Sequence, residues 1–388
     1  MRSTETSGHW VGRRRGGLAV AMLLVAATCV VGAVAAGQAG PTFKKAGGWG
    51  KVGTANGQFR GNAYGLATSK SGDVYVADTD NFRVQVFSAS GAFKRSFNFA
   101  ADDSAQDVAT GPDGAAWASI LKAGEVRSLG GSGGPLSTDK QALGVAVDAN
   151  GNVYASTAGD NVQKVVRFDK ASGYAPSKTL GGFADPADVE VSPDGSVYVV
   201  DGLTVKRFLN DKLVKTIKGG ASKPLGIGVD LDCNLWMTNI AQRNLTKASP
   251  TGKVLGTVTG DDLIAQDVAV GPKGDLYAYD SGKHAIVRFA EDRSKPATAA
   301  VVGSVTVANG KAKVKYTLSG VACPAQVAAT ASLSGAVNGK TSVKVAAGKS
   351  TVLSIPAKGS SGKAQFKIVL KTNGRPTTQV ASVNVTAR

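Results

Sequence analysis

The sequence is poor in the residues that build catalytic and metal centres. Only 2 of its 388 residues are histidine, and His9 precedes an N-terminal apolar run, so the remainder of the chain holds His284 alone. This scarcity excludes a zinc site with several histidine ligands and leaves a histidine-dependent mechanism a single base. The chain also lacks a Gly-x-Ser-x-Gly nucleophile motif and a glycine-rich phosphate loop. We therefore predict no catalytic residues.

Helical periodicity is missing as well. The chain has 50 glycines, 6% aromatic residues and many Val, Thr and Ala residues, but no long amphipathic stretch. This composition is typical of short strands joined by turns. The length allows two cores of ordinary size, or one long repeat domain with a smaller companion.

Residues 1–36 are predicted to be an export signal. Arg13, Arg14 and Arg15 precede an apolar run from about Leu18 to Ala36, which ends in small residues that suit a signal peptidase. Because the run is almost long enough to cross a bilayer, an uncleaved signal anchor is the alternative. The protein is thus expected to be secreted or held at the extracellular face of the membrane. In that oxidising environment Cys233 and Cys323 either form a disulfide or remain two small buried residues.

Positive charge is concentrated at the C-terminal end. Residues 297–388 hold twelve Lys or Arg and no Asp or Glu, whereas residues 37–296 hold 29 basic and 27 acidic residues. The overall basicity is therefore no argument for nucleic acid as a partner. For an exported protein, the basic segment indicates either contact with anionic cell-wall polymer or membrane surface, or a merely solubilising lysine surface.

Six repeats of about 40 residues account for the middle region. Each repeat contains two short apolar segments around a turn, with the turn position at Gly72, Gly114, Gly151, Gly195, Cys233 and Gly274. Three residues after each of these positions stands an aromatic residue: Tyr75, Trp117, Tyr154, Tyr198, Trp236 and Tyr277. A side chain that recurs in every repeat serves a contact that every repeat makes, so we expect these aromatics to pack between repeats.

The repeats predict the blades of a β-propeller. A third alternating segment, such as "RVQVF" ending at Phe87, and a fourth, such as "SPTGKVLGTV" from Ser249, complete four antiparallel strands per repeat. The sixth repeat ends after its third strand, and "PTFKKAGGWG" from Pro41 has the composition of the missing one. We expect this segment to close the ring as the outer strand of the last blade.

The first repeat resembles a known family. "GQFRGNAYGLATSKSGDVYVADTDNFRVQVF", from Gly57, is similar to the NHL repeat, and the likeness extends loosely over residues 43–293. The resemblance implies a six-bladed propeller over residues 37–296, which in bacteria is commonly an extracellular binding or sensor module. Phe82 stands where the family has histidine, and only "KHAI" in repeat six keeps one, His284, for which the family pattern implies a structural role in a blade strand.

Residues 297–388 differ in kind. Alternating segments such as "GSVTVANGKAKVKYTLSG" from Gly303 and "KAQFKIVLKTNG" from Lys363 are separated by Gly, Asn and Ser turns. We expect a small β-sandwich, immunoglobulin-like or fibronectin-like. The predicted fold class is thus all-β, a six-bladed β-propeller followed by a small β-sandwich.

Aspartate distinguishes alternate repeats. Asp107, Asp188 and Asp267 begin the first strand of blades two, four and six, where blades one, three and five have glycine. If the first strand is innermost, the three carboxylates surround the central channel at about 120° from one another. One hypothesis is a Ca²⁺ or Mg²⁺ site at the channel mouth, with Gln106 and Gln266 as neighbouring ligand-binding groups. The alternative is that each aspartate accepts hydrogen bonds from local backbone N–H groups and never meets the others.

Two other acidic turns only resemble calcium loops. "DANGN" from Asp148 and "DLDCN" from Asp230 lack the remainder of that pattern, including its glutamate, so we interpret them as turns. The sequence therefore predicts an exported, non-catalytic binding or scaffold protein of the cell envelope. It would be a monomer that binds a protein or glycan on the propeller face and anionic envelope material through the basic module. A propeller enzyme of lyase or lactonase type, with a divalent cation at the channel mouth, is the alternative.

Overall fold

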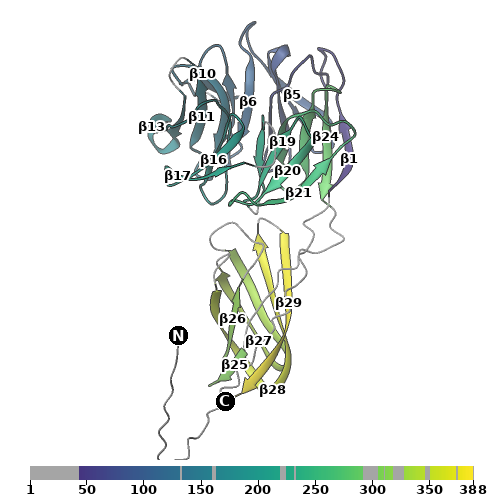
Figure 1. Ribbon diagram of the computed structural model, residues 1–388, viewed down its shortest axis with the longest axis vertical. Coiled ribbons are helices and arrows are strands. Elements are labelled where there is room, and N and C mark those ends of the chain that lie inside the picture. Colours follow the sequence, from purple (N-terminus) through teal and green to yellow (C-terminus); the bar gives the residue numbers. More distant parts are fainter. Residues whose placement is uncertain are drawn as a thin grey trace, which may run out of the picture. The chain divides into compact units, whose positions relative to one another are not determined.

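The protein is built from strands. The computed structural model describes residues 43–131, 133–159, 163–218, 224–230, 233–291, 305–309, 311–317, 327–345, 350–372 and 375–387. Within these residues the only helices are two single 3-10 turns, η1 (Thr79–Asn81) and η2 (Lys170–Ser172) (Figure 1). No helix in the described part is long and apolar enough to cross a membrane. The predicted export signal, residues 1–36, lies outside it.

Six four-stranded antiparallel sheets confirm the propeller prediction. In five of the six blades the strands pair in their order along the chain, and blade six takes its fourth strand from Phe43–Trp49. Blades one to three comprise β2 (Gly65–Thr68), β3 (Val74–Asp78), β4 (Arg83–Phe87) and β5 (Phe93–Asn98); β6 (Ala105–Thr110), β7 (Ala116–Ile120), β8 (Glu125–Leu129) and β9 (Leu136–Ser137); and β10 (Gln141–Val147), β11 (Val153–Ala158), β12 (Lys164–Asp169) and β13 (Ala175–Leu180). Blades four to six comprise β14 (Pro186–Val191), β15 (Val197–Asp201), β16 (Thr204–Leu209) and β17 (Lys212–Ile217); β18 (Ile227–Val229), β19 (Leu235–Asn239), β20 (Asn244–Ala248) and β21 (Val254–Thr259); and β22 (Ala265–Val270), β23 (Leu276–Asp280), β24 (Ala285–Glu291) and β1 (Phe43–Trp49).

The predicted turn position has the same backbone conformation in all six repeats. The five glycines there have φ between 80° and 91°, and Cys233 has φ 57°. Left-handed backbone favours glycine, which explains the repeat of glycine at this point. Cys233 is fully buried and disulfide-bonded. The other two cysteines, Cys29 and Cys323, lie outside the described residues, so the pairing of Cys233 with Cys323 stays a prediction.

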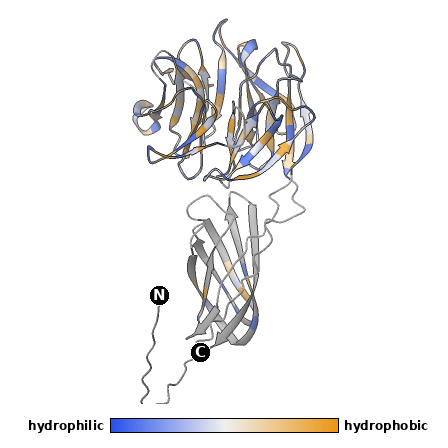
Figure 2. Cartoon of the chain, viewed as in Figure 1, coloured by the Kyte–Doolittle hydropathy of each residue, from blue (hydrophilic) through white to orange (hydrophobic). Residues whose placement is uncertain are grey.

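The recurring aromatics pack between blades, as predicted. Each of the six is at least 94% buried and lies in an apolar cluster with residues of the next blade. Tyr75 of blade one packs with Val108 of blade two, and Tyr277 of blade six packs with Leu66 of blade one. Figure 2 shows hydrophobic and hydrophilic residues along the strands of the propeller. Because both faces of a blade meet neighbouring blades, second strands such as β3 and β19 are buried along their whole length. Six such clusters form the propeller core.

The N-terminal strand closes the ring. β1 pairs antiparallel with β24 as the outer strand of blade six, which confirms the closure predicted from composition. The link from β1 to β2 is held by blade one: Arg83 donates to the carbonyls of Ala55 and Gln58 at 2.9 Å and to Asp78 at 2.7 Å. Phe59 of the link is fully buried. The repeat with the closest family likeness is thus the one that anchors the closure.

The C-terminal strands form one connected sheet. β25 (Val305–Ala308), β26 (Lys311–Thr317), β27 (Val327–Val345), β28 (Ser350–Thr372) and β29 (Arg375–Ala387) lie in the order β26-β25-β29-β28-β27. β28 also pairs with β26 over Ser350–Pro356 and with β29 over Gly362–Thr372, so one long strand joins two halves. The Gly359–Gly362 stretch has the composition of a turn, but β28 continues through it. The small β-sandwich is confirmed in outline, and its immunoglobulin-like character stays a prediction.

Candidate functional site

The three repeated aspartates lie on the innermost strands. The first strands of neighbouring blades contact one another around the whole ring, β2, β6, β10, β14, β18 and β22, and then β2 again. The inner position assumed for them is therefore correct. Asp107 on β6, Asp188 on β14 and Asp267 on β22 come from alternate members of this ring.

Each carboxylate connects its blade to the next. Oδ2 of Asp107 accepts the Val145 N–H at 2.8 Å, Oδ2 of Asp188 accepts the Ile227 N–H at 2.6 Å, and Oδ2 of Asp267 accepts the Leu66 N–H at 2.6 Å. The other oxygen of Asp107 and of Asp267 accepts the N–H of the following residue at 2.7 Å. The three bridges run from blade two to three, from four to five and from six to one. They are charge-assisted hydrogen bonds to backbone N–H groups at the axis.

The glycines of the odd blades make room for these aspartates on the other side, between each odd blade and the even blade that follows it. A Cβ on Gly226 would lie 2.1 Å from Oδ1 and 2.5 Å from Cα of Asp267, and a Cβ on Gly65 would lie 2.4 Å from Cα of Asp107. A Cβ on Gly144 would lie 2.8 Å from Cα of Asp188. Each glycine therefore allows the inner strand of the following blade to come into backbone contact. The alternation of Gly and Asp in the sequence therefore reflects an interlocking arrangement of the inner strands of neighbouring blades.

The carboxylates raise one another's pKa. Burial raises the pKa of Asp107 well above its usual value, and the charge of Asp267 raises it further. Burial and the charge of Asp107 raise the pKa of Asp188 well above its usual value. Burial and the charge of Asp188 likewise raise the pKa of Asp267. The backbone hydrogen bonds that these carboxylates accept lower their pKa. The three aspartates thus accept backbone hydrogen bonds, as the local-bonding alternative expects, and their charges also act on one another.

Glu190 is a fourth carboxylate of this group, and the sequence interpretation missed it. It lies on β14, two residues after Asp188 and hence on the same face of the strand. Burial raises its pKa to about 7, and its charge raises the pKa of all three aspartates. A signal was present in the repeats, because this position holds a small residue in the other five blades: Ala67, Ala109, Ala146, Gly228 and Ala269.

The hypothesis of a cation site concerns the same carboxylates. Among the described residues, no three or more His, Cys, Asp or Glu side chains gather closely enough to hold a metal ion. Gln266 donates instead to the Ser281 hydroxyl at 3.1 Å, and Gln106 is half-buried beside Asp107. Ca²⁺ or Mg²⁺ binding at the channel therefore stays a prediction, which a metal titration tests.

His284 occupies a tight turn. Its φ is 50°, and Phe82 has φ 53° at the corresponding position of blade one. Nδ1 of His284 lies 2.9 Å from the Gly61 carbonyl oxygen, which also accepts the Tyr279 hydroxyl at 2.7 Å. The imidazole thus attaches blade six to the link that closes the ring. This geometry agrees with the structural role that the family resemblance implies.

The turns that resemble calcium loops use their own carboxylates. Asp148 accepts the N–H of Asn150 at 2.8 Å and the N–H of Asn152 at 2.9 Å. Asp230 accepts the Asn234 N–H at 2.8 Å and pairs with Lys247 at 2.8 Å. These contacts are those of a turn-stabilising side chain, as predicted.

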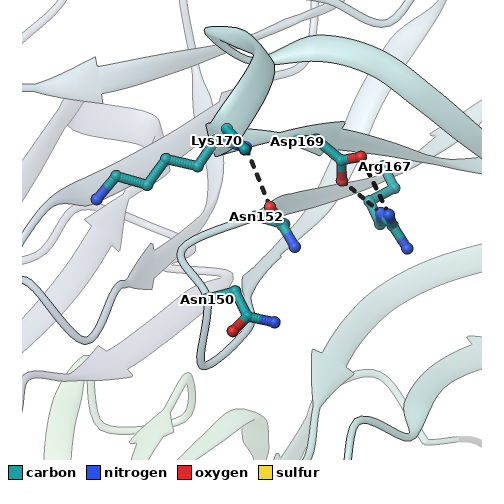
Figure 3. Close-up of a pocket in the computed structure, with 6 residues that line it drawn as sticks. Asn150, Asn152, Arg167, Asp169 and Lys170 are labelled. Carbon is teal, nitrogen blue, oxygen red and sulfur yellow. Dashed lines mark hydrogen bonds and ion pairs between the residues drawn. The ribbon is translucent and has the colours of Figure 1, made fainter.

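One of these turns lines an open pocket of about 550 Å³ in blade three. Figure 3 shows Asn150, Asn152, Arg167, Asp169 and Lys170 around it. Arg167 pairs with Asp169 at 2.6 Å, and the Lys170 ammonium pairs with an aspartate of blade two. Because these charges neutralise one another, the pocket offers little with which to select a ligand.

Comparison with known proteins matched one repeat of the propeller and several distantly similar structures. Residues 63–87 match the family model of the NHL repeat. Similar solved structures include a streptogramin B lyase (13% identity, 64% of this chain and 98% of that chain, TM-score 0.49) and the WD40 β-propeller domain of Doa1 (12% identity, 62% and 81%, TM-score 0.47). Another is a catalytically inactive virginiamycin B lyase from Staphylococcus aureus with quinupristin (14% identity, 71% and 96%, TM-score 0.48). No curated protein matched. The repeat match and the strand topology together support an NHL-type β-propeller.

Proposed function

We propose that this protein is an exported, non-catalytic binding or scaffold protein of the cell envelope. Its propeller would present the loop face, which carries the β1–β2 link and the loop between each blade and the next, to a protein or glycan ligand. Its C-terminal module would contact anionic envelope material. The proposal rests on one observation: the channel aspartates and His284 are engaged in hydrogen bonds that connect blades, so these residues support the fold.

The charge of the C-terminal module supports the anionic partner. Lys311 and Lys313 on β26 are exposed while Ala312 and Val314 between and after them are buried. Lys363 and two other described lysines of the module are exposed as well, and residues 297–388 contain no acidic side chain to pair with them. A basic surface without internal partners attracts polyanions in a salt-dependent way.

The loop face is the surface proposed to bind the protein or glycan ligand. It carries exposed apolar side chains at Val52, Tyr64 and Leu203, which are 64%, 39% and 63% exposed. Val52 and Tyr64 lie in the β1–β2 link, and Leu203 lies in the turn between β15 and β16. Loops on a rigid scaffold are where binding residues concentrate. A partner that contacts several blades is therefore the kind of ligand we propose.

The first experiment is retention of the protein by envelope fractions. Wild-type protein should be captured and released by salt, and removal of residues 297–388 should abolish capture. A variant with the exposed lysines of β26 and β28 changed to glutamine should lose most of the capture. A control in which an equal number of exposed propeller lysines are changed should keep it. Unchanged retention of the shortened chain would contradict the proposed role of the basic module.

A metal titration distinguishes the enzyme alternative from the binding protein. A channel-mouth cation predicts that Ca²⁺ or Mg²⁺ raises the melting temperature of the wild type and not that of Asp188→Asn. Equal shifts of the melting temperature in both proteins would contradict the cation site, and with it the cation on which the lyase or lactonase alternative depends.

A further inference from the structure

Two neighbouring blades expose apolar side chains at the start of their outer strands. Seven large apolar side chains of the described residues are exposed, and three of them lie on the loop face. The other four form two pairs: Leu213 and Val214 on β17, 51% and 47% exposed, and Val254 and Leu255 on β21, 46% and 39% exposed. Exposed apolar side chains that gather in this way mark an interaction surface.

A bulge in each strand brings both side chains of a pair to the surface. The pairing of β17 with β16 skips Val214, and the pairing of β21 with β20 skips Leu255. A bulge changes the direction of a side chain that would otherwise alternate with its neighbour. The residue skipped in the same way is Lys94 in blade one and Ser177 in blade three, so the apolar pair distinguishes blades four and five from them.

Lysines flank both apolar pairs. Lys212 and Lys215 enclose the pair on β17, Lys253 precedes the pair on β21, and all three are exposed. None of the three side chains forms an ion pair with a described residue, because the nearest acidic residue in sequence, Asp211, pairs with Lys178 of blade three at 3.6 Å. These three ammonium groups are therefore available to an anionic partner.

The two strand starts lie next to each other on one side of the ring, which we call the turn side. The turn before β21 reaches β17, since a Cβ at Gly252 would lie 3.5 Å from Ile217. β1 is antiparallel to the third strand of blade six just as β17 and β21 are to the third strands of their blades, so all three begin on the turn side. Phe43 at the start of β1 pairs with Glu291, so the described propeller chain also begins and ends there. The loop face lies at the other end of these strands.

The charge and the chain ends indicate an anionic membrane as the occupant. Apolar side chains flanked by lysines suit the head-group layer, where the ammonium groups meet lipid phosphates. The apolar run that ends at Ala36 is connected to Phe43 through six residues, which span at most about 25 Å. The basic residues 297–388 of the chain itself would be repelled by these lysines, since they carry the same sign of charge.

We propose that the turn side of blades four and five rests on an anionic membrane surface. The four apolar side chains lie among the lipid head groups, and the three lysines contact lipid phosphates. The strands enter no deeper, because their outer edges carry backbone N–H and C=O groups that need polar partners. The loop face then points away from the membrane. The inference goes beyond the proposed function, in which only the C-terminal module contacts anionic material, and does not depend on it.

Cosedimentation with vesicles of phosphatidylglycerol and phosphatidylcholine tests the apolar contact. The protein used is the chain from residue 37, because every described strand begins at Phe43 or later. Leu213→Ser with Leu255→Ser should weaken vesicle binding by about tenfold or more, because two apolar side chains no longer leave water. The matched control is Val52→Ser with Leu203→Ser, which removes exposed apolar side chains from the loop face and should bind like the wild type.

The same assay tests the charge. Lys212→Gln with Lys253→Gln should weaken binding to these vesicles by about tenfold, because each lysine near an anionic surface adds to the attraction. Lys218→Gln, an exposed lysine just after the other end of β17, should leave binding unchanged. Wild-type binding that is as strong to pure phosphatidylcholine vesicles would overturn the role of the lysines.

Hydrogen exchange with and without vesicles locates the contact. The amides of residues 212–216 and 253–257 should exchange more slowly on the vesicles, whereas those of β5 in blade one should not change. Equal vesicle binding by the turn-side variant and its loop-face control would overturn the inference, as would protection confined to residues 305–387. Protection of the turn side in concentrated protein without vesicles would show that a second copy covers it, and would also overturn the inference. Envelope retention through residues 297–388 is a separate result, so failure of the proposed function can be told apart.

Discussion

Even and odd blades follow the same plan, but they differ at one position of the innermost strand. The even blades place a carboxylate there, and it reaches across to a backbone N–H group of the next blade. The odd blades place a glycine there, which lets the neighbouring strand come within contact distance. The comparison teaches that the functional unit of this ring is a pair of blades. Substitution of the glycine and substitution of the aspartate should therefore lower the stability of the fold for different reasons.

The largest effect is expected from filling an odd-blade glycine. In Gly226→Ala the new Cβ would overlap Cα of Asp267, 2.5 Å away, so two inner strands must separate. We expect a loss of about 3 kcal/mol or more in the free energy of unfolding. Gly181→Ala is the control, because a Cβ at Gly181 meets nothing within 4 Å. Urea unfolding of both variants measures the difference, and similar stabilities would contradict the interlocking arrangement.

Removal of an even-blade carboxylate should cost somewhat less. Asp107→Ala leaves the buried N–H groups of Val108 and Val145 without their acceptor. Because it also relieves repulsion by Asp267, we expect a net loss of about 1–3 kcal/mol. Hydrogen exchange should show faster opening of both amides in the variant. Exchange that is as slow as in the wild type would show that other groups hold these strands.

The smallest effect, and one with the opposite sign, is expected from Glu190. Its pKa is about 7 in the folded protein and about 4.3 in an unfolded chain. Between these values the folded state binds more protons, so wild-type stability falls as the pH rises from about 4.3 to 7. Glu190→Gln removes the contribution of this residue and leaves that of the three aspartates, so the variant should be more stable than wild type by roughly 1–2 kcal/mol at about pH 8. Below about pH 4 the two should be equally stable, and parallel curves from acid to alkaline pH would contradict the assignment.

Much of the fold was predictable because every repeat contains the same turn and the same contact between blades. The glycine turn reflects a left-handed backbone, and the aromatic three residues later reflects the contact between blades, so both recur at readable spacing. Closure by the segment around Phe43–Trp49 followed from counting strands. The long strand β28 was not predictable, since its Gly359–Gly362 stretch has the composition of a turn but is held in a strand by pairing with distant residues.

The site was predictable only in part. The Gly and Asp alternation could be seen by aligning the chain with itself, but the acceptor role depends on N–H groups of the next blade, up to 201 residues away in sequence. Glu190 was passed over because its strand fits the apolar pattern around it. Its place became visible only when the inner strands were known to surround one axis. A charged residue where five related blades have Ala or Gly is the signal that such a comparison should seek.

The pairing of β1 with β24 has a consequence for the order of events during folding. β1, the first strand of the described residues, belongs to the last blade, so it stays without its partner β24 until about 240 further residues have been made. Until then blade six cannot be completed and its edge stays exposed. A nascent chain that stops before β24 therefore cannot close the propeller. Once β24 has been made, its pairing with β1 can complete the ring.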